Sequence, residues 1–88
     1  MSEDNVLNVT VISPEAILFE GTTESLVAPA FDGEVGILTG HAPMMPLLGK
    51  GMLRLGSGGG ERRFTIEGGF LQVVDNQVRV VTDRAAAA

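Results

Sequence analysis

The sequence predicts an all-β fold that forms a single small domain. Short apolar runs alternate at a period of two, turn residues recur roughly every 8–12 residues, and no stretch of helical period exceeds one turn. About eight to ten short strands with this spacing are typical of a β-sandwich or a β-barrel. The chain has 88 residues and is 44% hydrophobic, which suits one compact core.

In the first half of the chain, apolar runs are separated by proline and glycine. Leu7, Val9 and Val11 alternate with polar residues, and Pro14 ends this run because proline cannot donate to a strand ladder. Gly21 closes the next run. Strands are predicted at residues 5–12, 16–20, 22–29 and 35–39.

The second half is predicted to consist of two hairpins. The glycine-rich stretch 56–60 forms the tip of the first, and Asp75-Asn76 forms a two-residue loop with positive φ in the second. The strands are expected at residues 51–55, 62–67, 70–74 and 77–82. Residues 85–88 are helix-prone but too few to hold a helix alone, so we expect flexible ends at 1–4 and 85–88.

The composition disfavours several classes of protein. The net charge is -5, with only six lysines and arginines and no basic run, so we expect no nucleic-acid binding. Cysteine is absent, which removes disulfides and thiol chemistry. The acidic start lacks the layout of a signal peptide, and no apolar stretch approaches the ~20 residues of a spanning helix. The sequence therefore predicts a soluble, intracellular protein without direct membrane insertion.

A catalytic or metal-binding set is hard to assemble from these residues. His41 is the single histidine, and Asp32 and Glu34 flank a glycine turn that splays them apart. The glycine-rich stretch 56–60 leads into a strand, whereas a phosphate-binding loop would lead into a helix. Gly49-Lys50 matches only the end of a Walker motif. We expect no catalytic residue, no cofactor and no metal.

Two stretches can each be interpreted either as ordinary structure or as a contact surface for a partner. The stretch from Met44 to Leu48 is either ordinary core or an adaptable, partner-facing apolar patch. The polar bend from Glu34 to Pro43 is a turn by composition, although turns on a rigid scaffold are also where contacts are made. A generic β-sandwich module that binds a protein or ligand is one alternative function, and an enzyme of unknown class is a weaker one.

A resemblance narrows these alternatives. The stretch Asp32-Gly33-Glu34-Val35-Gly36-Ile37-Leu38-Thr39-Gly40-His41-Ala42-Pro43 resembles the motif G-E-x-G-I-x-x-G-H-A-P of epsilon subunits of F-type ATP synthases. Further similar stretches are residues 12–15, 19–21, 51–54, 66–73 and 78–83. The resemblance runs from about Leu7 to Ala85, and the ordered set of motifs is specific where any one alone would not be.

The resemblance implies a fold and a role. The family fold is a flattened ten-stranded β-sandwich followed by a C-terminal helical hairpin. This sequence stops at Ala88, just after the final predicted strand, so hydrolysis inhibition and ATP sensing, which belong to the hairpin, are not expected of it. The implied role is that of a non-catalytic central-stalk subunit. Such a subunit links the gamma subunit to the c-ring and couples proton flow to ATP synthesis.

Site residues and location follow from the same resemblance. The c-ring contact is expected at Glu34, Gly40, His41, Ala42 and Pro43, with Glu34 suited to pairing with a basic loop residue. Packing on the gamma subunit is expected from Met44, Met45 and Leu47. The expected location is the cytoplasmic face of a bacterial inner membrane, held there through the complex, with the stromal face of a plastid thylakoid as the alternative.

Overall fold

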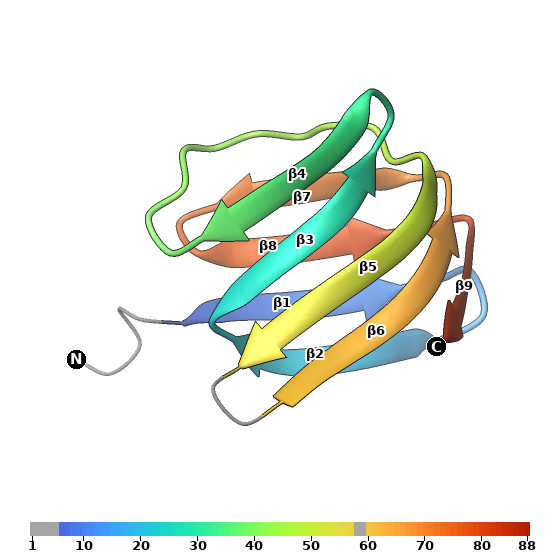
Figure 1. Ribbon diagram of the computed structural model, residues 1–88, viewed down its shortest axis with the longest axis horizontal. Coiled ribbons are helices and arrows are strands. Elements are labelled where there is room, and N and C mark those ends of the chain that lie inside the picture. Colours follow the sequence, from blue (N-terminus) through green and yellow to red (C-terminus); the bar gives the residue numbers. More distant parts are fainter. Residues whose placement is uncertain (1–5, 58–59) are drawn as a thin grey trace.

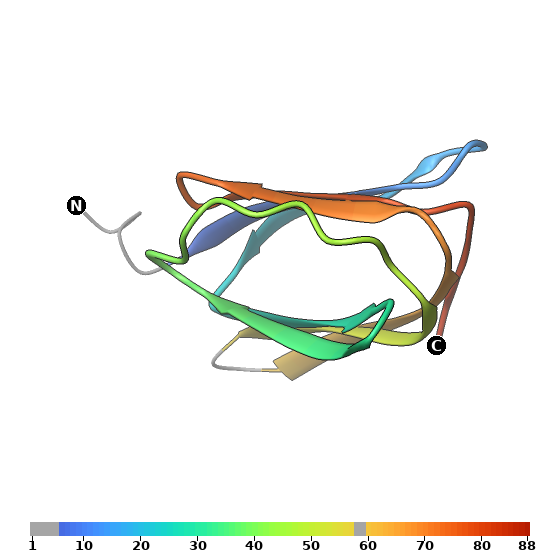
Figure 2. The same ribbon diagram turned by 90° about the horizontal axis from the view of Figure 1, so that it is seen from above.

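Two β-sheets face each other in the computed structural model, which describes residues 6–57 and 60–88. Figure 2 shows them as two layers, and Figure 1 shows the strands of one layer crossing those of the other. One sheet has the order β2-β1-β8-β7, with β1 (Leu7–Ile12), β2 (Ile17–Thr23), β7 (Phe70–Val74) and β8 (Gln77–Val81). The other has the order β4-β3-β5-β6-β9, with β3 (Ser25–Ala30), β4 (Gly33–Leu38), β5 (Lys50–Ser57), β6 (Gly60–Glu67) and β9 (Arg84–Ala87). The predicted β-sandwich is confirmed.

The core lies between the sheets and is built by the alternation seen in the sequence. In β1 every second side chain is buried, beginning with Leu7, and in β6 Phe64 and Ile66 are buried between exposed neighbours. The buried apolar residues are Leu7, Val9, Val11, Leu26, Ala28, Ile37, Leu48, Leu53, Leu55, Phe64, Ile66, Leu71, Val73, Val78 and Val80. These closely packed apolar side chains make the sandwich a stiff scaffold.

The turn between β7 and β8 has the geometry that its residues predict. Asp75 and Asn76 have φ of 50° and 61°, and these two residues tolerate positive φ better than most. The hairpin places β8 beside β1, and this pair is parallel. Because of this pairing, the first strand of the chain lies in the middle of a sheet completed by its last hairpin.

The number of strands differs from the family expectation of ten. The described residues form nine strands, and the stretch from Met44 to Leu48 adds isolated bridges along β7 where a further strand would lie. Strand β2 was expected to end at Gly21, but it continues past this residue to Thr23. Gly21 pairs with Val9, and the ring of Phe19 lies close to it, 3.3 Å from where a Cβ would be.

The last residues of the chain form a strand, which the sequence did not predict. Residues 84–87 form strand β9 against β6, so the expectation of a flexible end at 85–88 is wrong for Ala85–Ala87. Pairing with the open edge of β6 overrides the weak strand preference of alanine. Residues 1–4, for which a flexible end was also predicted, lie outside the described residues, as do residues 58 and 59 of the stretch 56–60 that was predicted to form a hairpin tip.

Two turns meet at one corner of the fold: Thr82 lies where the chain passes from β8 to β9, and Gly69 lies where it passes from β6 to β7. The Thr82 side chain is buried, and its Oγ1 lies 2.9 Å from the Gly68 carbonyl oxygen and 3.1 Å from that of Arg84. Gly69 has φ of 98°, and a Cβ there would lie 1.9 Å from the Val81 carbonyl oxygen. A side chain at Gly69 is therefore excluded by both the backbone conformation and the available space.

Replacing Gly69 by alanine should destabilise the fold by about 2 kcal/mol or more, because positive φ and a backbone clash both oppose the methyl group. The matched control is Gly36→Ala, since Gly36 lies in a strand with no atom within 4 Å of the position that a Cβ would occupy. That control should change stability by less than about 1 kcal/mol. Urea unfolding of both variants measures these changes in stability. Equal unfolding midpoints would contradict the conclusion that a side chain is excluded at Gly69.

Candidate functional site

The residues expected to contact the c-ring lie along β4, but at its two ends. Strand β4 is an edge strand of the five-stranded sheet, with Glu34 near its start and the Gly40–Pro43 bend beyond its end. Roughly 13 Å of strand separates Glu34 from Leu38, at about 3.3 Å per residue. The structure therefore does not bring Glu34 and the bend together at one point. A partner that touches both must extend along the whole β4 edge.

Glu34 is exposed and already has a cationic neighbour. Its Oε1 lies 3.5 Å from the guanidinium of Arg54 on β5, and the side chains are 62% and 40% exposed. An exposed pair at this distance holds neither group strongly. Glu34 thus remains available to a basic group on a partner, with Arg54 beside it.

The Gly40–Pro43 bend is held by hydrogen bonds to β4 and to the β7–β8 turn. Gly40 has φ of 81°, and its N–H donates to Oδ1 of Asn76 at 2.8 Å. The His41 N–H donates to the Leu38 carbonyl at 3.2 Å, and its ring Nδ1 lies 2.8 Å from the Ala42 carbonyl oxygen. The bend is consequently a shaped surface whose backbone is tied both to β4 and to the opposite sheet.

The stretch from Met44 to Leu48 leaves the bend and runs antiparallel along β7, as Figure 2 shows in light green. Met44 exchanges backbone hydrogen bonds with Val73 at 2.9 and 3.1 Å, and its half-buried side chain packs against the core. Met45 and Leu47 point outward and are 62% and 65% exposed. Of the three residues expected to pack on gamma, two have the exposure needed for contact and Met44 belongs mainly to the core.

Leu47 ends an apolar row that the sequence analysis missed. The strand registers place Ile17 beside Ile12, Ile12 beside Val81, and Val81 beside Phe70, which bridges to Leu47. The row crosses the outer face of the whole four-stranded sheet, and its end members Ile17 and Leu47 are 60% and 65% exposed. Its members come from separate strands, so the signal appears only once the registers are known.

The Leu47 end of the apolar row adjoins the turn between β3 and β4, which precedes Glu34. The Phe31 N–H donates to the Leu47 carbonyl at 2.8 Å, which joins the β3–β4 turn to the end of the row. The Phe31 side chain is 79% exposed, and the sequence analysis missed it as well. One end of the sandwich therefore combines exposed apolar groups with the Glu34 carboxylate.

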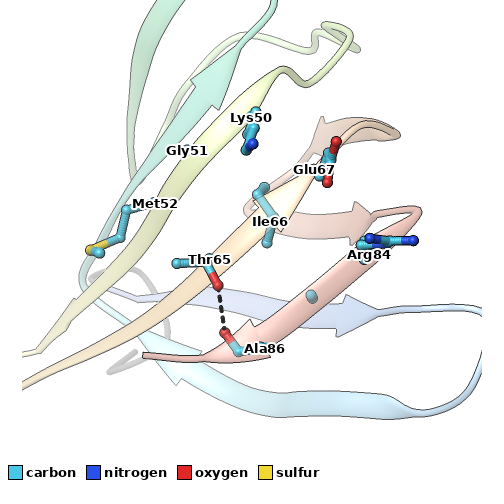
Figure 3. Close-up of a pocket in the computed structure, with 9 residues that line it drawn as sticks. Lys50, Gly51, Met52, Thr65, Ile66, Glu67, Arg84 and Ala86 are labelled. Carbon is cyan, nitrogen blue, oxygen red and sulfur yellow. Dashed lines mark hydrogen bonds between the residues drawn. The ribbon is translucent and has the colours of Figure 1, made fainter.

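A separate hollow lies on the five-stranded sheet beside β9. It encloses about 420 Å³ and is lined by Lys50, Gly51, Met52, Thr65, Ile66, Glu67, Arg84, Ala85 and Ala86. Figure 3 shows Met52 at one side and the charged groups of Glu67 and Arg84 at the other. The polar groups do not converge on a common point, as they do in a specific ligand site.

The part of the chain that the structure describes contains no group of three or more His, Cys, Asp or Glu side chains placed to hold a metal ion. In residues 6–57 and 60–88, no helix has the length and apolar character needed to cross a bilayer.

Comparisons with known proteins agree with the fold and identify the family. Residues 6–88 match the family model described as "ATP synthase, Delta/Epsilon chain, beta-sandwich domain". A chain of the mitochondrial ATP synthase of Euglena gracilis, solved by cryo-EM with OSCP, F1 and c-ring, superposes with a TM-score of 0.87 at 23% identity. That match covers 94% of this chain and 54% of the other, and it supports the sandwich fold.

Two curated relatives are similar over most of the sequence. The ATP synthase epsilon chain of Leptospira borgpetersenii is 48% identical over 80 residues, covering 91% of this chain and 63% of the relative. The corresponding chain of Leptospira interrogans is 43% identical over 82 residues, covering 93% and 65%. This chain thus spans a little under two thirds of the length of these relatives. It belongs to the ATP synthase delta/epsilon chain β-sandwich family.

Proposed function

We propose that this chain is a non-catalytic central-stalk component of an F-type ATP synthase. In this role the sandwich binds the gamma subunit through the apolar row and contacts the c-ring through the β4 edge. It thereby couples proton flow to ATP synthesis. The expected location is peripheral, on the cytoplasmic face of a bacterial inner membrane or on the stromal face of a thylakoid.

The observation that carries the proposal is the apolar row. A row of five apolar side chains across a sheet face is costly to leave in water, and such patches mark sites of protein contact. A β-sheet changes shape little on binding, so contacts on its outer face can transmit force without a hinge. Both properties suit a permanent place on a rotating shaft.

The β4 edge supplies a contact of a different chemical kind. Glu34 and Arg54 present opposite charges near one end, and the bend presents His41 and backbone groups at the other. Charged and polar groups of this type give orientation and specificity more than affinity. The repeated polar loops of a ring offer contact points along the length of this edge.

The first test is binding to the gamma subunit of the same organism. Co-elution on size exclusion followed by titration should show a one-to-one complex with this chain. Absence of binding by the folded chain would contradict the proposed attachment through the sandwich.

Leu47→Ser should weaken binding to gamma about tenfold or more, because the variant removes a leucine from the buried contact. Leu38→Ser is the matched control. Leu38 is 63% exposed, close to the 65% of Leu47, but lies on β4 outside the row. Titration calorimetry should show a loss of affinity for Leu47→Ser only, with both variants as stable as the parent. Equal effects of the two substitutions would exclude the row as the gamma contact.

Glu34→Lys should weaken attachment to the c-ring and reduce coupled proton pumping, because it replaces an acid with a base at the proposed contact. Glu61→Lys is the matched control, since Glu61 is also exposed and pairs with Arg63 on the same sheet at 3.0 Å. Each reversal should change the stability of the domain by less than about 1 kcal/mol. ATP-driven proton pumping by the assembled enzyme distinguishes the two variants. Unchanged pumping with Glu34→Lys would refute the proposed role of Glu34 in the c-ring contact.

A further inference from the structure

Asn76 does more than its position in a turn requires. It is the second residue of the two-residue β7–β8 loop and has φ of 61°. Its carbonyl oxygen accepts the Asn8 N–H at 2.9 Å, which helps to join the hairpin to β1. Glycine would satisfy both of these backbone requirements at least as well. The amide side chain is therefore free to serve another purpose.

That side chain reaches across to the bend. Asn76 Oδ1 accepts the Gly40 N–H at 2.8 Å, although 36 positions separate the two residues in the sequence. Gly40 has φ of 81°, and no atom lies within 4 Å of the position that a Cβ would occupy, so its backbone conformation, and not lack of space, makes glycine suitable here. The 2.8 Å separation is that of a well-formed hydrogen bond.

The other hydrogen bonds of the bend do not attach it to the four-stranded sheet. The His41 N–H bonds to Leu38 within the same segment, at 3.2 Å, and the next link to the four-stranded sheet is at Met44. Within the described part of the chain, the Asn76–Gly40 bond is the one that joins the Thr39–Pro43 backbone to that sheet. Without it, the five residues from Thr39 to Pro43 would have no backbone hydrogen bond to that sheet.

The same two segments share one surface. Asp75 and Asn76 line a shallow hollow together with Gly40, His41, Ala42 and Pro43. A partner that contacts the bend therefore also meets the β7–β8 turn, and the shape of that surface depends on how the two are held together.

We propose that Asn76 is a positioning residue for the partner contact made by the Gly40–Pro43 bend. This inference rests on the proposed function, in which the bend meets the c-ring. By accepting the Gly40 N–H, Asn76 holds the bend in one conformation before the partner arrives, which lowers the entropy lost on binding. The variant that isolates this effect is Asn76→Gly, because glycine retains the turn and removes only the acceptor. Asn76→Asp retains an acceptor oxygen and tolerates positive φ.

The first readout is hydrogen exchange of the Gly40 amide in the free chain. Asn76→Gly should accelerate exchange about tenfold or more, whereas Asn76→Asp should keep the amide protected. An unchanged Gly40 exchange rate in Asn76→Gly would overturn the inference, because the bond would then not hold the bend.

The second readout is retention of the chain on the c-ring in the assembled enzyme, measured by co-purification, with His41→Ala as a direct test of the bend. We expect Asn76→Gly and His41→Ala both to lower retention several-fold and Asn76→Asp to preserve it. If His41→Ala lowers retention and Asn76→Gly does not, the positioning role is wrong and the proposed contact stands. If neither variant has an effect, the bend is not a ring contact, and both proposals for it fail.

Discussion

The hydrogen bonds between the Met44–Leu48 stretch and β7 are the constraint on which the rest of the surface depends. Met44 pairs with Val73, and the Leu71 and Leu48 N–H groups donate to Pro46 and Gly69. These bonds cover an edge of the four-stranded sheet that would otherwise be open to pairing with another chain. The Leu47 carbonyl accepts from Phe31 of the other layer, so this one stretch ties the two sheets together.

The same bonds decide which side chains are available to a partner. They place Leu47 outside, beside Phe70, and Leu48 inside, where it is only 5% exposed. A slip of one residue in this register would bury Leu47 and expose Leu48. The apolar row is therefore a consequence of backbone pairing as much as of composition, and its continuity depends on a segment that is not itself a regular strand.

Much of the fold could be predicted from the sequence, because local patterns determine most of it. The alternation of Leu7, Val9 and Val11 and the Asp75-Asn76 loop were sufficient for the first strand and the last hairpin. Strand β9 could not be predicted, since three alanines carry no strand signal and the pairing comes from β6. The separation of Glu34 from the bend was already implied by the predicted strand 35–39 between them.

The remaining features of the site needed contacts between distant positions. No local pattern links Asn76 to Gly40, or Ile17 to Leu47, because each connection follows from how strands from different parts of the chain are ordered in the sheets. Glycine, asparagine and single exposed aliphatic residues are also common in any β-protein, so their types alone indicate nothing unusual. From the sequence, Glu34 and the Gly40–Pro43 bend stood out through the resemblance to a family, and the Met44–Leu48 stretch stood out through its apolar composition.

The two proposed contacts differ in physical character, and this difference suits their different tasks. Burial of the apolar row against a shaft subunit depends little on salt, because it is driven by removing apolar surface from water. The charged and polar β4 edge is exposed, so contacts there are screened and individually weak. A firm attachment to the shaft combined with weaker, orienting contacts along the ring would keep the subunit fixed to one partner while it follows the other. The ordered bend matters most on the weaker side, because a contact with little intrinsic affinity has the most to gain from a surface whose conformation is already set.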